Sequence, residues 1–128
     1  FAAEAFTLEP PGGCRDESDA TIEEAGRREL LEETGYAAGE VVYANQCWLW
    51  STKANGRANI LLAFNCHKVQ EPEREPAERA AGMEVLEVGL VTALRGIAEA
   101  NESSEYRDAK LAHGLIALLA YRKMIAGI

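Results

Sequence analysis

The stretch Arg28-Glu29-Leu30-Leu31-Glu32-Glu33-Thr34-Gly35 decides how this chain is expected to fold. Its glutamates Glu29, Glu32 and Glu33 stand at positions i, i+3 and i+4, which places all three on one face of an α-helix. Like charges at that spacing repel, so helix propensity gives no reason to group them. A divalent cation would explain the grouping, and carboxylate-only ligand sets suit Mg²⁺ or Mn²⁺ better than zinc. A solvated acidic helix face is the alternative.

The helix that carries these glutamates is expected to begin near Ala20 or Thr21, with Asp19 or Ser18 as its N-cap. Its end is predicted at Thr34-Gly35, because glycine adopts the left-handed conformation that commonly closes a helix. Gly26 in the helix interior costs up to about 1 kcal/mol relative to alanine. A close crossing over a sheet would justify that cost.

A glycine turn precedes the helix in the segment Pro10-Pro11-Gly12-Gly13. The prolines end any strand, because they cannot donate a ladder hydrogen bond, and the glycines permit backbone angles closed to other residues. Such a turn before a helix lets the backbone come close to a ligand. A plain tight turn is the alternative.

Length and composition indicate one globular domain over residues 1–128, since 48% of the residues are apolar. The net charge of −8 argues against a nucleic acid or an anionic membrane as partner, because both need basic surface. The cysteines Cys14, Cys47 and Cys66 form no C-x-x-C pair, so reduced thiols in a cytoplasm are expected. No apolar run approaches membrane-spanning length.

Apolar patterning predicts the remaining elements, which together indicate an α/β fold with a mixed sheet packed between helices. Strands are predicted over residues 1–8, 40–50, 58–69 and 83–91, a hairpin turn over 51–57, a charged loop over 70–82, and helices over 92–100 and 107–125.

The glycine turn, the polar loop and the segment Arg28 to Tyr36 together resemble the Nudix box. The second half follows that family's Arg-Glu-apolar-x-Glu-Glu-x-Gly-apolar pattern throughout. The resemblance implies the Nudix α/β/α sandwich and a pyrophosphohydrolase that uses Mg²⁺ or Mn²⁺ held by Glu29, Glu32 and Glu33. The segment Phe6 to Gly13 is similar to ADP-ribose and nucleoside-diphosphate-sugar pyrophosphatases, which implies metal-facing roles for Glu9 and the Gly12 carbonyl.

The chain departs from the family pattern in two places. The spacing from Gly13 to Arg28 is one residue longer than in the family, and Asp19 stands where a loop-supporting Glu is expected. The chain also has fewer residues before the box than the strands of family members need, so the fold is expected to be short of N-terminal strands. A sheet edge left open in this way would be paired by another chain, which predicts a homodimer.

The resemblance implies hydrolysis of the diphosphate linkage in a nucleoside diphosphate joined to another moiety, giving a nucleoside monophosphate and a phosphorylated moiety. Arg28, Gly13 and Asp19 are expected to support the site, and Arg28 to pair with Glu32. The general base is expected to be Glu78, or else Glu32 or Glu33. Trp48 and Trp50 are candidates for stacking on the base of the substrate, and core packing is the alternative. A Nudix-fold binding module without turnover is the alternative function.

Overall fold

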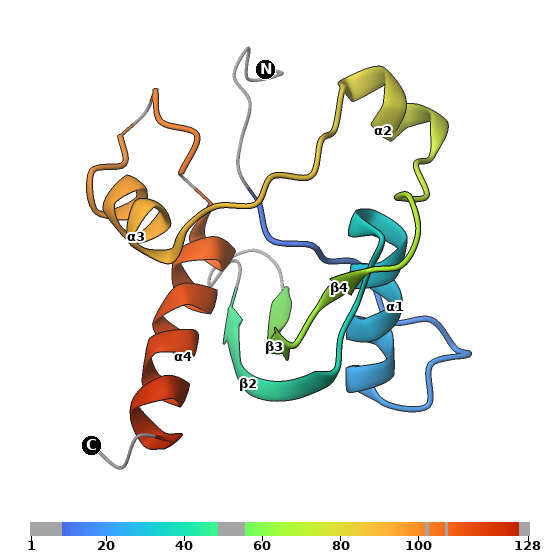
Figure 1. The fold of residues 1–128 in the computed structure, drawn as a ribbon, viewed down its shortest axis with the longest axis horizontal. Helices are drawn as coiled ribbons and strands as arrows, with labels where there is room; N and C mark the ends of the chain where they lie inside the picture. Colours follow the sequence, from blue (N-terminus) through green and yellow to red (C-terminus); the bar gives the residue numbers. More distant parts are fainter. Residues whose placement is uncertain (1–8, 49–55, 102, 107, 126–128) are drawn as a thin grey trace. The chain divides into compact units, whose positions relative to one another are not determined.

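The computed structural model describes residues 9–48, 56–101, 103–106 and 108–125. These residues form helices and short strands, shown in Figure 1: α1 (Ile22–Thr34), β1 (Tyr36–Ala37), β2 (Glu40–Trp48), β3 (Arg57–Phe64), β4 (His67–Lys68), α2 (Pro76–Ala81), α3 (Leu90–Ala98) and α4 (Ala109–Ile125). The predicted α/β class is therefore confirmed. Within the described part, the expected mixed sheet is represented by two two-stranded sheets, β1 with β4 and β2 with β3.

The chain divides into two compact units. One contains residues 11–43 and 61–87, and therefore α1, β1, β4 and α2; we call it the box unit. The other contains residues 1–10, 44–60 and 88–128, and therefore α3 and α4; we call it the helical unit. The strand predicted for residues 1–8 lies outside the described residues, as does most of the turn predicted for residues 51–57.

Helix α1 begins one residue after Thr21, whose hydroxyl accepts a hydrogen bond from the Glu24 amide at 3.1 Å. The prediction of Asp19 or Ser18 as N-cap was wrong. Thr21 has the extended backbone of a cap, and the Asp19 carboxylate accepts from the Asp16 amide at 2.8 Å and from Arg28. Because that carboxylate is occupied within the loop, the helix is capped two residues later.

The body of α1 packs closely against β3. A Cβ added at Gly26 would lie 3.3 Å from a methyl carbon of Leu61, tighter than most real contacts. The glycine inside the helix is thus explained by the expected close crossing over a strand. Ala25 and Leu62 form the buried apolar core of the box unit.

The C-terminal end of α1 leads directly into the small sheet. Gly35 has φ of 79° and its amide donates to the Leu31 carbonyl at 2.8 Å, as the left-handed cap requires. Tyr36 then pairs with Lys68, and Ala37 with His67, in antiparallel register. The predicted strand 58–69 is therefore interrupted. Asn65 takes a positive φ of 53°, which asparagine tolerates better than most residues, and it separates β3 from β4.

Two further sequence predictions were wrong. The charged loop 70–82 contains helix α2, which starts with Pro76 in its first turn and with the Glu75 amide bonded to the Glu78 carboxylate at 2.9 Å. The strand predicted for residues 83–91 is absent from the described structure, where residues 83–89 have no ladder partner and α3 begins at Leu90. An alternating apolar pattern makes a strand only where a neighbouring strand receives its hydrogen bonds.

In the helical unit, α3 and α4 contact each other, and Gly114 of α4 lies close to Ile60 of β3. Ala93 of α3, Ala117 of α4 and Ile60 of β3 are its buried apolar residues. His113 on α4 is hydrogen-bonded to Asn45 at 2.8 Å, which gives this histidine a structural partner.

We predict that Gly35→Ala destabilises the protein more than Gly82→Ala does. Both glycines have positive φ, 79° and 71°, so each substitution incurs the left-handed cost of about 1–2 kcal/mol. A Cβ at Gly35 would also collide with the Gln70 carbonyl, whereas nothing lies within 4 Å of a Cβ at Gly82. Urea unfolding of the two variants measures the difference. Equal losses of unfolding free energy would show that the contact with Gln70 does not constrain the end of α1.

Candidate active site on helix α1

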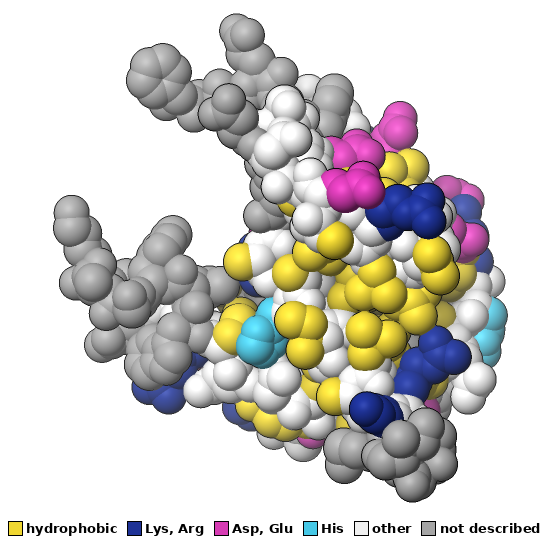
Figure 2. Space-filling model, turned by 90° about the vertical axis from the view of Figure 1, so that its left-hand side faces the viewer, with side chains coloured by type: hydrophobic (Ala, Val, Ile, Leu, Met, Phe, Trp, Pro, Cys, Tyr) yellow, Lys and Arg dark blue, Asp and Glu magenta, His cyan; other side chains and the backbone are white. Residues whose placement is uncertain are grey.

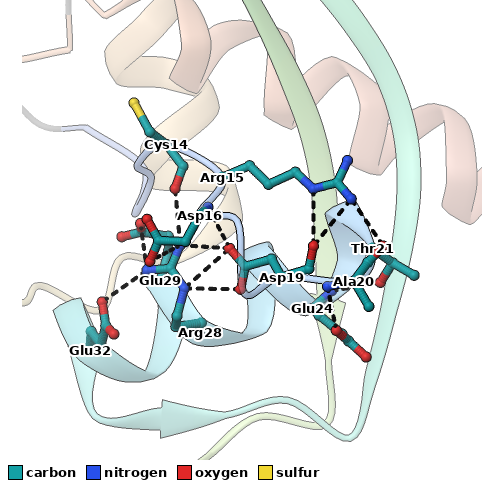
Figure 3. Close-up of polar contacts among 10 residues, drawn as sticks. All are labelled: Cys14, Arg15, Asp16, Asp19, Ala20, Thr21, Glu24, Arg28, Glu29 and Glu32. Atoms are coloured by element: carbon teal, nitrogen blue, oxygen red, sulfur yellow. Dashed lines mark hydrogen bonds and ion pairs between the residues drawn. The ribbon is translucent and has the colours of Figure 1, made fainter.

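Arg28 lies at the centre of the polar contacts on α1 (Figure 3). Its guanidinium donates to the Asp19 carboxylate through Nε at 3.1 Å and through Nη2 at 3.0 Å. This is the bidentate geometry in which arginine binds carboxylates most strongly. Nη2 also donates to the Cys14 carbonyl at 2.9 Å. The side chain of Asp19 is only 6% exposed. These contacts fold the polar loop 14–19 back onto the helix.

The same guanidinium holds two of the three box glutamates. Nη1 donates to Glu29 Oε1 at 3.0 Å and to Glu32 Oε2 at 3.2 Å. The expected ion pair between Arg28 and Glu32 is therefore present. Asp16 adds a further carboxylate at 3.5 Å. One cation thus offsets the repulsion among several carboxylates of the helix and the loop.

These contacts change the ionisation of both partners. The hydrogen bonds from Arg28, followed by the bond from the Asp16 amide, lower the pKa of Asp19 below its ordinary value of 3.8. The bond to Asp19 in turn raises the pKa of Arg28 above its ordinary value. The lowered pKa favours the ionised form of Asp19, and it is this form that accepts the bonds joining the loop to the helix.

The glycine turn lies against the acidic face of α1. The Gly12 amide donates to Glu33 Oε2 at 3.0 Å. A Cβ at Gly13 would collide with the Glu29 carboxylate, so only glycine leaves room for that side chain. The structure therefore brings the two glycines of the box next to Glu29 and Glu33, from a part of the chain well before the helix.

Glu33 lies in a distinct environment. Burial raises the pKa of its carboxyl, and the charges of Glu29 and Glu78 raise it further, while the Gly12 amide and Arg74 oppose the shift. A carboxyl that is half-buried beside other carboxylates gains from a proton or from a cation. A cation beside Glu33 would therefore favour its ionised form.

Residues 73 and 74, which the sequence did not indicate as part of the site, form hydrogen bonds with the C-terminal end of α1. The Glu73 amide donates to the Glu32 carbonyl at 2.7 Å, and Arg74 Nη1 donates to the Glu33 carbonyl at 2.7 Å. These contacts satisfy carbonyls that a helix end leaves without intrahelical partners. Residues 73 and 74 immediately precede α2, so they also bring Glu78 near Glu33. No local pattern marks Arg74 for this role, because the contact spans 41 positions in sequence.

The other predicted site residues lie elsewhere or cannot be placed. Glu9 belongs to the helical unit, where its charge contributes to the raised pKa of Lys110. Trp48 ends β2, but its side chain is outside the description, and Trp50 lies among the residues not described. Their roles toward substrate remain predictions.

The donor chemistry of the acidic face fits a hard divalent cation. Glu29, Glu32 and Glu33 supply oxygen donors, and the glycine turn lies directly against Glu29 and Glu33. Glu29 and Glu32 each bind Arg28 through one oxygen, which leaves the other as a donor. In the described residues, no three His, Cys, Asp or Glu side chains are yet gathered around a common metal position. Metal binding at this face therefore requires these carboxylates to reorient.

A family model for the NUDIX domain matches residues 2–110. The chain belongs to the Nudix family. This membership supports pyrophosphohydrolase chemistry in general and agrees with the box predicted from the sequence. No curated protein and no solved structure matches the chain. In the part of this Nudix protein that is described, no helix is long and apolar enough to cross a membrane.

We predict that Asp19→Asn lowers stability at neutral pH and that the deficit disappears in acid. A carboxyl whose folded pKa is lowered contributes stability above its unfolded pKa and loses it as pH falls through the folded pKa. The gap in melting temperature between the wild type and the variant should therefore be full at pH 7 and should close progressively below about pH 4.

The control for this experiment is Glu17→Gln, which removes an exposed carboxylate from the same loop. Its melting temperature should follow that of the wild type across the pH range. A deficit of Asp19→Asn that stays constant down to pH 2 would show that the ion pair with Arg28 is not what Asp19 contributes.

Proposed function

We propose that this Nudix protein hydrolyses the diphosphate linkage of a nucleoside diphosphate joined to another moiety, of the ADP-ribose or nucleoside-diphosphate-sugar type. The products would be a nucleoside monophosphate and a phosphorylated moiety. The cofactor would be Mg²⁺ or Mn²⁺ held by Glu29, Glu32 and Glu33. The free state of Cys14, Cys47 and Cys66 agrees with the cytoplasm expected from the sequence.

One observation carries this proposal. The glycine turn lies against Glu29 and Glu33 while Arg28 fixes Glu29 and Glu32 on the same helix. The two halves of the box, separated in sequence, therefore meet at one acidic face. A diphosphate is itself anionic and this chain carries a net charge of −8, so the acidic face needs a cation to accept such a substrate.

Each residue of the site would have a distinct role in hydrolysis. Arg28 and Asp19 hold the loop and the helix in register, and the Gly12 amide orients Glu33. When bound, the metal supplies charge neutralisation for the diphosphate and a water of lowered pKa. Glu78, or else Glu32 or Glu33, would take the proton of the attacking water. Glu78 has one carboxylate oxygen bonded to the Glu75 amide, which holds the side chain and leaves the second oxygen for that role.

Substrate contacts outside the acidic face rest on the family resemblance. Trp48 and Trp50 stand two residues apart in the strand predicted from the sequence over residues 40–50, so both would share one face of it and could stack on the base of a nucleotide. Glu9 and the Gly12 carbonyl are proposed as further contacts toward the metal and the substrate.

A non-catalytic nucleotide-binding module is the second candidate. It is favoured by the occupation of Glu29 and Glu32 by Arg28, because no three acidic side chains of the described part are gathered for a metal. In such a module Arg28 would keep the carboxylates neutralised internally, and nucleotide would bind without turnover.

The proposal is tested by incubating the protein with Mg²⁺ and a panel of ADP-ribose, sugar nucleotides, dinucleoside polyphosphates and nucleoside triphosphates. We expect cleavage of the nucleoside-diphosphate conjugates, with Glu33→Gln reducing kcat by at least about 100-fold. Binding of Mn²⁺, followed by electron paramagnetic resonance, should weaken in Glu33→Gln. If Glu78 is the base, Glu78→Gln should lose a similar factor in kcat while Mn²⁺ affinity stays unchanged.

The matched control is Glu71→Gln, which removes an exposed carboxylate of the same loop and only its surface ion pair with Lys68. It should leave both kcat and Mn²⁺ binding unchanged. Undiminished cleavage by Glu33→Gln would contradict the assignment of the site. Absence of cleavage across the panel, with nucleotide binding retained, would replace the enzyme by the binding module.

A further inference from the structure

The carbonyl groups at the C-terminal end of α1 are bonded to a segment from a later part of the chain. A helix leaves its last carbonyls without intrahelical partners. The Glu32 carbonyl accepts from the Glu73 amide at 2.7 Å, and the Glu33 carbonyl accepts from Arg74 Nη1 at 2.7 Å. Both of these helix residues belong to the acidic face. The later segment therefore bonds to the backbone of two residues whose side chains are proposed metal ligands.

The start of this segment is bonded to the same end of α1. The Gly35 carbonyl accepts from the Val69 amide at 2.9 Å and from the Gln70 amide at 3.3 Å. We call residues 69–74 the anchor segment, because both of its ends are bonded to the end of the helix. Among these contacts, the bond from Arg74 is the one that a side chain makes. A substitution can therefore remove it without altering a backbone group.

Arg74 also supplies a charge that α1 itself lacks at this end. The last turn of α1 has no basic residue, although Glu32 and Glu33 lie there at the negative end of the helix dipole. The charges of Arg74 and Glu78 both act on the Glu33 carboxyl, with opposite sign. Both side chains therefore lie near Glu33.

The chain between Arg74 and Glu78 is short and stiff. Glu75 is the N-cap of α2, and its amide donates to the Glu78 carboxylate at 2.9 Å. Pro76 fixes its own φ and restricts the residue before it to extended backbone, which Glu75 has at φ −70° and ψ 157°. A shift of Arg74 therefore also moves Glu78.

We propose that Arg74 is a positioning residue for the hydrolysis, because its bond to the Glu33 carbonyl holds the start of α2, and with it Glu78, beside the acidic face. This inference rests on the proposed function, with Glu78 as the group that takes the proton of the attacking water. A general base must lie within hydrogen-bond reach of that proton, directly or through one water. Displacing Glu78 therefore lowers kcat, whereas the affinities for substrate and metal depend on other groups.

The kinetic test is a double-mutant cycle of Arg74→Gln and Glu78→Gln, measured on the best substrate of the panel. Arg74→Gln should lower kcat by at least about tenfold, since small misplacements of a reacting group are costly, and should leave KM and Mn²⁺ affinity within about twofold. In a chain that already carries Glu78→Gln, adding Arg74→Gln should change kcat by less than about twofold, because the carboxylate that Arg74 positions is gone. Arg74→Lys keeps the charge and a donor, so it should recover most of the lost kcat.

Amide hydrogen exchange of the metal-free protein tests the attachment without any turnover. The Glu73 amide should exchange at least about tenfold faster in Arg74→Gln than in the wild type, because the anchor segment then opens more often. The Gly35 amide is bonded within α1 to the Leu31 carbonyl, so its exchange rate should stay within about twofold of the wild type. Equal acceleration of both amides would overturn the proposal, since Arg74 would then stabilise α1 as a whole.

The charge-matched control is Arg79→Gln, which removes an exposed cation from the last turn of α2. A remote control is Val91→Ala on α3, at a position that is 69% exposed in the helical unit; Figure 2 shows the face of the molecule to which α3 and α4 belong. Both controls should leave kcat and the exchange of the Glu73 amide unchanged.

Two kinetic outcomes separate this proposal from the proposed function. Cleavage by the wild type, with Arg74→Gln lowering kcat by the same factor whether or not Glu78→Gln is present, would refute the role of Arg74 alone. Absence of cleavage by the wild type across the panel would refute the proposed function, and the role of Arg74 in hydrolysis with it.

Discussion

The pairing of Arg28 with Asp19 is the interaction on which the rest of the box depends. A charge held away from water is tolerated only when it is paired and hydrogen-bonded, and the Asp19 side chain is only 6% exposed. The guanidinium meets this requirement with two bonds to the carboxylate and one to the Cys14 carbonyl. Removing Arg28 would leave the Asp19 carboxylate without the cation that it pairs with, and the loop would lose these bonds to the helix. The glycine turn, which immediately precedes that loop, would then no longer be held against Glu29 and Glu33.

The acidic face binds an internal cation, Arg28, through the same carboxylates that are proposed to hold a metal. Arg28 takes one oxygen from Glu29 and one from Glu32, while Glu33 is left with a backbone amide and a raised pKa. The internal cation keeps the carboxylates together in the absence of metal, because unpaired like charges at helical spacing would separate. The same contacts compete with an added cation for the same oxygens. The affinity of the proposed metal would therefore depend on how readily Glu29 and Glu32 release Arg28.

The sequence predicted the local parts of this site well, and the structure shows why. The spacing of the glutamates, the Gly35 cap and the Arg28–Glu32 pair all lie within one helix, so neighbouring residues determine them. The strand predicted for residues 83–91 failed because a strand depends on a partner elsewhere in the chain. The contact of Arg74 with the Glu33 carbonyl was missed for the same reason. Helix α2 did carry local signals, Pro76 at its start and the Glu75–Glu78 capping pair, but the prolines and charges of that segment favoured a loop.

The ion pair between Asp19 and Arg28 forms in the presence of both departures of the box from the family pattern. Asp19 stands where a Glu is expected, and its side chain is one methylene shorter, so its backbone must come closer to Arg28 for the same ion pair. One more residue separates Asp19 from Arg28 than in the family pattern. Arg15 donates to the carbonyls of Asp19 and Ala20 at 3.1 and 2.9 Å, and Thr21 then starts the helix two residues after the carboxylate. The bonds from Arg15 to this backbone and from Arg28 to this carboxylate hold the loop on the helix with the spacing and the shorter acid that this chain has.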